Sequence, residues 1–169
     1  MNTGFDDEHK ISWAKMRYKK DEEGINQLNI YYAENVNGEW KDIKPVPFND
    51  HQYSNSHPAL SPDGSTLYFT SDRPGGKGKA DIYKVSIAKD GTFGNPVNLG
   101  DNINTEGKEG FPFVDSNGTL YFSSDAHLGI GGLDVFAAGK SLDASPSWFN
   151  YKTKAISKYF LEKIFCDVK

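Results

Sequence analysis

One stretch of this sequence occurs twice, and the spacing of its copies limits the folds that the chain can adopt. Residues 61–72 read SPDGSTLYFTSD and return 53 positions later at 114–125 as VDSNGTLYFSSD. The tripeptide Asp81-Ile82-Tyr83 returns at the same spacing as Asp134-Val135-Phe136. A period of this length is typical of a whole supersecondary unit that stacks on its neighbours. The chain is therefore predicted to be an array of similar units.

An earlier, less complete copy precedes these two. Asn29-Ile30-Tyr31 stands 52 positions before Asp81-Ile82-Tyr83, and Asn37-Gly38-Glu39-Trp40 stands 53 positions before Asp90-Gly91-Thr92-Phe93. Three copies are thus represented, and we regard two of them as incomplete.

Each copy has the pattern of a small antiparallel sheet. In residues 66–71, Leu67 and Phe69 alternate with Tyr68 and Thr70, so the two faces of the strand are both largely apolar or aromatic. A sheet of this kind needs a neighbour on each face, which radial stacking in a β-propeller supplies. We predict an all-β chain, a partial β-propeller of about two and a half four-stranded antiparallel blades with a C-terminal helix. The strands predicted for the middle copy are 57–60, 66–71, 81–87 and 95–99.

The predicted organisation follows the repeat. Residues 1–10 form a disordered N-terminal tail, residues 11–138 form the blades, and residues 139–169 form a divergent tail in which the pattern fails. The blade boundaries are 11–48, 49–99 and 100–138, and residues 11–18 would be a strand of the first blade. Within 152–169, apolar residues recur at helical spacing and predict a helix that covers a sheet edge or face, or else binds a partner or a membrane surface.

Charge and cysteine content exclude several classes of function. The chain has 19 Lys and Arg against 23 Asp and Glu, a net charge of −4, so it offers no broad cationic surface to nucleic acid. Cys166 is the only cysteine, which excludes an internal disulfide and a cysteine-based zinc cluster. The charged first ten residues are no secretory signal, and no later stretch reaches membrane-spanning length. We expect no cofactor, no metal site and no direct membrane insertion.

The repeated residues resemble a known family. The stretch from Ser61-Pro62-Asp63-Gly64 to Gly76, followed by Asp81-Ile82-Tyr83, resembles the WD40-like PD40 repeat of TolB-type propellers. The third copy, with Phe111-Pro112-Phe113 and Gly131-Gly132-Leu133-Asp134, is similar to propellers of OmpA-family envelope proteins of Bacteroidetes, including type IX secretion components. The resemblance covers roughly residues 11 to 138. It implies a propeller in the periplasm, associated with the outer membrane.

The resemblance implies a noncatalytic scaffold for protein–protein interaction in the bacterial cell envelope, with other envelope proteins as partners. We therefore expect no enzyme activity. The alternative is a carbohydrate-binding or glycoside-hydrolase-like propeller, because aromatic and acidic side chains suit sugar rings and hydroxyls. A third hypothesis is a structural relic without a function of its own.

Candidate partner-binding residues are those that interrupt the repeat or lie in the loops between blades. At a spacing of 53 residues, Arg73 aligns with Ala126, His57 with Gly110, and Lys77 with Ile130. Loops held by a rigid scaffold commonly carry binding residues. The rim loops considered are 51–57, 73–79 and 125–132. The candidates are Tyr53, His57, Arg73, Lys77, Glu109 and His127, each of which could instead be ordinary solvated loop decoration.

Fewer than three whole blades cannot close a ring, so open edges and apolar faces are expected. The tail, a second copy of the chain through self-association, or a longer protein of which this chain is a fragment would account for them. We favour the last explanation.

Overall fold

The computed structural model describes residues 17–20, 23–129, 131–139 and 148–149, and every regular element in them is a β-strand. All pairs of strands within the sheets are antiparallel, which confirms the all-β prediction. The predicted helix within 152–169 lies outside the described residues. In the described part of the chain there is no helix of the length and apolarity that crossing a bilayer requires.

The middle copy of the repeat forms one four-stranded sheet, as predicted. Its strands are β5 (Asn55–Leu60), β6 (Thr66–Ser71), β7 (Asp81–Ser86) and β8 (Val97–Asn98), and they pair in chain order. On one face, Leu67 lies opposite Val85 and Phe69 lies opposite Tyr83. Such cross-strand pairs of aromatic and aliphatic side chains stabilise a sheet.

The third copy repeats this sheet and extends past its predicted boundary. The sheet contains β9 (Glu109–Val114), β10 (Leu120–Ser124), β11 (Asp134–Ala138) and β12 (Trp148–Phe149), again in chain order. Strand β12 pairs with β11 and lies beyond residue 138, the predicted end of the third blade. Strand β12 is defined by its backbone pairing with β11, because its sequence does not repeat that of the fourth strand of the middle sheet.

The N-terminal copy forms two separate hairpin-like pairs. In the first, β1 (Arg17–Lys20) pairs with β2 (Asn26–Asn29), and in the second, β3 (Tyr31–Val36) pairs with β4 (Glu39–Pro45). Of the strand predicted at 11–18, only residues 17 and 18 lie in the described part, where they begin β1.

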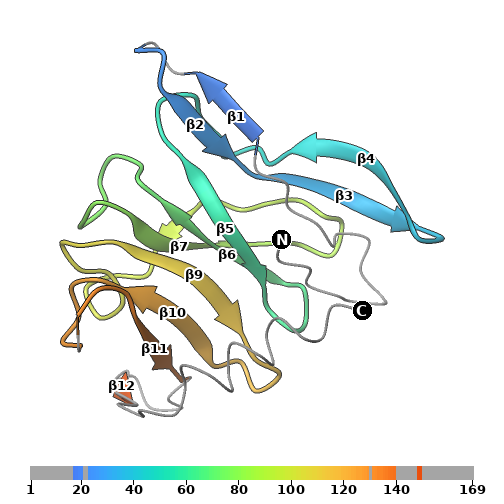
Figure 1. The fold of residues 1–169 in the computed structure, drawn as a ribbon. Coiled ribbons are helices and arrows are strands. Elements are labelled where there is room, and N and C mark those ends of the chain that lie inside the picture. Colours follow the sequence, from blue (N-terminus) through green and yellow to red (C-terminus); the bar gives the residue numbers. More distant parts are fainter. Residues whose placement is uncertain (1–16, 21–22, 130, 140–147, 150–169) are drawn as a thin grey trace.

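The middle sheet lies between the other two groups of strands and is covered on both faces (Figure 1). Phe69 faces the N-terminal group, whereas Ile82 faces the third sheet, and both are fully buried. The buried side chains of the first core are Ile30, Val46, Leu67, Phe69, Tyr83 and Val85. Those of the second core are Ile82, Ile103, Val114, Leu120 and Phe122. The expectation that both faces of a repeat unit need cover is confirmed for the middle sheet.

A repeated asparagine joins each unit to the next. The Asn49 side chain accepts a hydrogen bond from Ile30 N (3.1 Å) and donates one to Ile30 O (2.6 Å). Asn104 makes the same two bonds with Ile82, at 2.8 Å and 3.0 Å. Each amide thus supplies the donor and acceptor that a neighbouring strand would offer to the isoleucine backbone. The same pair of asparagine-to-isoleucine hydrogen bonds therefore joins the first unit to the second and the second to the third.

The spacing of the repeat changes by one residue at the first turn of each sheet. Gly64 and Gly118 both have positive φ, 66° and 80°, and donate equivalent turn hydrogen bonds to Ser61 O and Asp115 O. They stand 54 positions apart, whereas Leu67 in β6 and its counterpart Leu120 in β10 stand 53 apart. Before the turn, 54 is therefore the correct spacing. The predicted alignment of His57 with Gly110 is wrong, and His57 corresponds to Phe111.

The turn between β5 and β6, which is the longer of the two, contains a pH-dependent contact. Side-chain hydrogen bonds from Ser61 and Ser65 lower the pKa of Asp63 from 3.8 to about 2. Because the folded-state pKa is depressed, the stabilisation is present above the unfolded pKa and is lost as pH falls from about 4 towards 2. We expect the Asp63→Asn variant to lose less stability than the parent across this window. Urea unfolding midpoints at pH 5 and pH 2.5 measure the difference, and parallel pH profiles would contradict it.

Candidate interaction site

Arg73 packs inward over aromatic rings. Its guanidinium carbon lies 4.9 Å from the ring centroid of Tyr83, 5.2 Å from that of Phe69 and 5.0 Å from that of Tyr53. Its Nη2 donates to Asn55 Oδ1 at 2.8 Å. Burial lowers the pKa of this guanidinium from its ordinary value. Two predicted candidates, Arg73 and Tyr53, are thus in mutual contact at the end of the first core.

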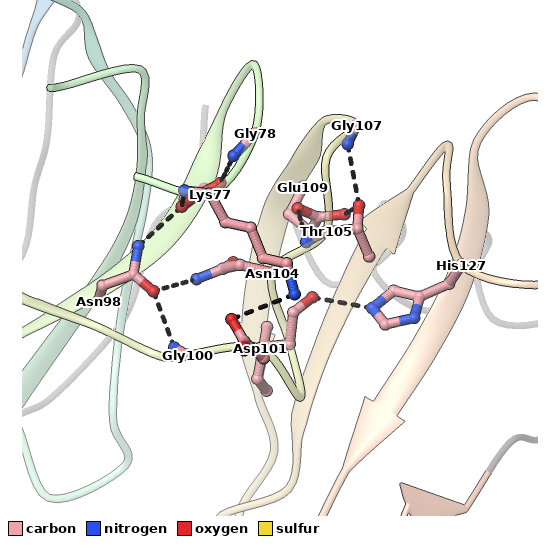
Figure 2. Close-up of polar contacts among 12 residues, drawn as sticks. Lys77, Gly78, Asn98, Gly100, Asp101, Asn104, Thr105, Gly107, Glu109 and His127 are labelled. Atoms are coloured by element: carbon pink, nitrogen blue, oxygen red, sulfur yellow. Dashed lines mark hydrogen bonds and ion pairs between the residues drawn. The ribbon is translucent and has the colours of Figure 1, made fainter. Parts of the chain in front are cut away.

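His127 follows Ala126, the repeat counterpart of Arg73, and contacts the corresponding aromatic residues of the third sheet. Its ring centroid is 5.9 Å from that of Phe122 and 5.0 Å from that of Phe136, the counterparts of Phe69 and Tyr83. Its Nε2 lies 2.8 Å from Ile103 O (Figure 2). Arg73 in the middle sheet and His127 in the third sheet therefore each pack against a corresponding pair of aromatic rings.

Glu109 is buried at the start of β9, with 1% of its surface exposed. Its carboxylate accepts hydrogen bonds from Thr105 N (2.9 Å), Thr105 Oγ1 (2.6 Å) and Ser124 Oγ (2.6 Å). It occupies the position that Asn55 has in β5, since each lies opposite the equivalent serine of the next strand. A buried carboxylate needs such donors, and these three tie the inter-sheet loop to the strand.

Lys77 holds the glycine-rich loop before β7 in two ways. Its backbone N–H donates to Asp81 Oδ2 at 2.6 Å, and its Nζ lies 3.1 Å from Asp101 Oδ1 (Figure 2). Gly78 N and Asn98 Nδ2 also donate to the Asp81 carboxylate, at 3.0 Å and 2.7 Å. The partner of Lys77 in the repeat, residue 130, lies outside the described residues.

The third sheet has the same loop arrangement around Asp134. A Cβ placed on Gly129 would overlap the Asp134 carboxylate, as one on Gly76 would crowd that of Asp81 at 2.8 Å. Glycine therefore permits each loop to close over its aspartate. In the described residues, no group of three or more His, Cys, Asp or Glu side chains is arranged to hold a metal ion.

His57 contacts Phe111, a largely exposed aromatic residue of the third sheet. Both have left-handed backbone conformations, φ 47° and 53°, at irregular points of β5 and β9. Their ring centroids are 4.0 Å apart, and Phe111 is 59% exposed. A bulky residue at positive φ is uncommon, and such conformations are found more often at functional positions. The pair is thus an aromatic platform formed by two neighbouring sheets.

Sequence reasoning identified His57 but missed Phe111. The two residues occupy the same place in the repeat, where the copies read His57-Pro58 and Phe111-Pro112. An alignment at a spacing of 54 would have shown this match. The remaining candidates, Arg73, Glu109, Lys77 and His127, are engaged in contacts within and between the sheets.

Protonation of His57 should destabilise the protein. Burial lowers its pKa below 6.5, so the unfolded chain binds a proton at higher pH than the folded chain does. The Ser56 hydroxyl, at 3.2 Å, and the Phe111 ring contact the imidazole, and both are uncharged. We expect unfolding midpoints to fall as pH decreases below about 6.5. The His57→Gln variant should lose this part of the pH dependence, and an unchanged slope between pH 7 and pH 5 would contradict it.

No protein-family model matches this sequence, and a comparison with curated proteins finds no match either.

Proposed function

We propose that the chain is part of a β-propeller of the WD40-like type and acts as a noncatalytic scaffold for protein–protein interaction in the bacterial cell envelope. The repeated sheets, the repeated asparagine connection and the double-sided cover of the middle sheet support the propeller. The resemblance of its motifs to envelope propellers supports the location in the periplasm, near the outer membrane.

One comparison between equivalent residues carries the scaffold proposal. Ile82 in β7 and Val135 in β11 are the same position of the repeat, on the same face of their sheets. Ile82 is 0% exposed, because the third sheet packs over it, whereas Val135 is 46% exposed. This face of the third sheet thus has the apolar character that the middle sheet buries against a neighbour. It is the surface on which a further sheet or a partner protein would pack.

The carboxylates support a noncatalytic role. Asp72 accepts a hydrogen bond from Ser54 N, and its repeat counterpart Asp125 accepts one from Lys108 N, both at 2.7 Å. Asp81 and Glu109 are likewise occupied by backbone and side-chain donors. A residue that makes the same bond in successive copies serves the fold of each copy.

The interaction test compares two exposed valines. Val135→Lys places a charge on the proposed face, and Val97→Lys places one on strand β8, where the valine is 53% exposed. In capture experiments with bacterial envelope extracts, we expect a partner retained by the parent and by Val97→Lys to be lost with Val135→Lys. Equal retention by both variants would contradict the proposal.

A crystal structure of the full chain tests the propeller. We expect successive sheets to be related by a constant rotation about one axis, with β5 and β9 nearest to it. Packing of the sheets as a sandwich or as one continuous barrel would overturn the propeller and the scaffold role inferred from it.

A further inference from the structure

Two of the three repeat units receive an asparagine side chain on the backbone of an isoleucine. Asn49 accepts from Ile30 N and donates to Ile30 O, and Asn104 makes the same two bonds with Ile82. Both isoleucines are buried, with 1% and 0% of their surfaces exposed. One carboxamide thus satisfies a buried N–H and a buried C=O together. Because the contact occurs at two connections, it indicates that this backbone edge recognises a carboxamide.

The third unit has the same edge at Val135 in β11. Val135 lies opposite Ser123 of β10, as Ile82 lies opposite Thr70 of β6. The Ile82 N–H and C=O are bound by Asn104 outside β6, so the pair with Thr70 is one of the non-hydrogen-bonded pairs of the ladder. The Val135 N–H and C=O therefore also point away from β10. In the described residues, β12 pairs only with the last two residues of β11.

Exposed apolar side chains accompany this edge. Leu133 is 57% exposed and Val135 is 46% exposed. Their counterparts in the middle sheet contact the next unit: Ala80 O accepts from Glu109 N at 2.7 Å, and Ile82 is buried in the second core. Within the described residues, no further sheet covers this side of the third sheet (Figure 1). The interface that the middle sheet completes is therefore open at the third sheet.

The segment that follows β11 does not contain the equivalent asparagine. In residues 140–169, the only Asn or Gln is Asn150. The pairing of β12 with β11 assigns Asn150 to the position of Asn98, the last residue of β8. Asn98 has a different role from Asn104, since its Oδ1 accepts from Asn104 and its Nδ2 donates to Asp81 (Figure 2). The carboxamide that would bind Val135 is therefore not provided by this segment.

We propose that the edge of β11 at Val135 binds a segment of a partner polypeptide in which an apolar residue precedes an asparagine. The asparagine carboxamide accepts from Val135 N and donates to Val135 O. In the two occupied connections, Phe48 precedes Asn49 and Ile103 precedes Asn104, and both apolar residues pack in the adjoining core. This inference rests on the proposed function, because it names what a partner on the open side of the third sheet supplies.

A synthetic peptide with the sequence of residues 100–113, GDNINTEGKEGFPF, is the probe for this site. We expect it to bind the full chain in fluorescence anisotropy titrations and to slow hydrogen exchange of the Val135 amide. Asn104→Asp in the peptide should weaken binding about tenfold, because a carboxylate cannot donate to Val135 O. The matched control is Asn102→Asp, which adds the same charge at a residue that is exposed in the chain and should bind like the parent peptide.

Two variants of the chain locate the binding. Val135→Lys should abolish binding of the parent peptide, whereas Val97→Lys in β8 should retain it. If the two peptide variants bind equally but Val135→Lys abolishes binding, the carboxamide inference is overturned and the proposed interaction face stands. Binding that survives Val135→Lys, or no binding at millimolar peptide, also overturns the inference. Capture of partners from envelope extracts then decides the proposed function separately.

Discussion

Replacing Phe69 with alanine should lower the free energy of unfolding by about 3–5 kcal/mol, the usual cost of removing a fully buried aromatic side chain. Phe69 is 0% exposed and packs with Phe48 and Tyr83, at ring-centroid distances of 4.9 Å and 5.9 Å. Its loss also removes one of the rings beneath the Arg73 guanidinium. The cavity would lie at the centre of the first core, between the N-terminal strands and the middle sheet.

Phe111→Ala is the matched control for this prediction. It deletes the same side chain at a position that is largely exposed, so we expect a change of less than about 1 kcal/mol. Urea unfolding followed by tryptophan fluorescence measures both variants, with an unchanged m-value as the sign that the two states are otherwise comparable. Similar losses for the two variants would mean that the first core does not carry the stability assigned to it.

The sheets could be predicted because their signals are local. Alternation of apolar side chains in 66–71 and the turn residues beside them are enough to locate β6, and the repeat then places β10. Strand β12 was missed, because its position depends on backbone pairing with β11 and the side chains there depart from the repeat. Pairing of this kind leaves little trace in a single sequence.

The candidate site was less accessible to sequence reasoning. A charged residue such as Arg73 after a strand suggests a surface contact, yet its guanidinium lies over rings contributed by distant parts of the chain, including Tyr53 and Tyr83. Glu109 similarly looks like a loop carboxylate and is buried among donors. Whether a charged group faces solvent or an aromatic core depends on contacts between segments, which the local pattern does not contain.

The equivalence of His57 and Phe111 was missed because the repeat spacing differs by one residue on the two sides of a turn. Leu60 pairs with Leu67 but Val114 pairs with Leu120, so the turn after β9 is one residue shorter than the turn after β5. A single fixed spacing therefore misaligns β5 and β9. Once the spacing is corrected, the two aromatic residues with positive φ occupy the same position. Their pairing then follows from the face-to-face arrangement of neighbouring sheets.

Asn104→Ala should lower the free energy of unfolding by about 3 kcal/mol, because it leaves a buried backbone N–H unsatisfied and removes two further hydrogen bonds. Asn104 is fully buried, accepts from Ile82 N, and donates to Ile82 O and Asn98 Oδ1. Ile82 O still accepts from Leu99 N, so the penalty falls mainly on Ile82 N.

The control for this variant is Asn102→Ala, which makes the same substitution at an exposed position of the same loop and should have little effect. Hydrogen exchange provides a local measurement. In Asn104→Ala, the Ile82 amide should exchange faster than in the parent. Amides at the centre of β6 should still exchange only through global unfolding. If both variants are equally stable, the asparagine connection is dispensable and the repeated sheets are joined by apolar packing alone. If Asn104→Ala alone is destabilised, the polar link between successive sheets is as much a part of the repeat as its apolar faces.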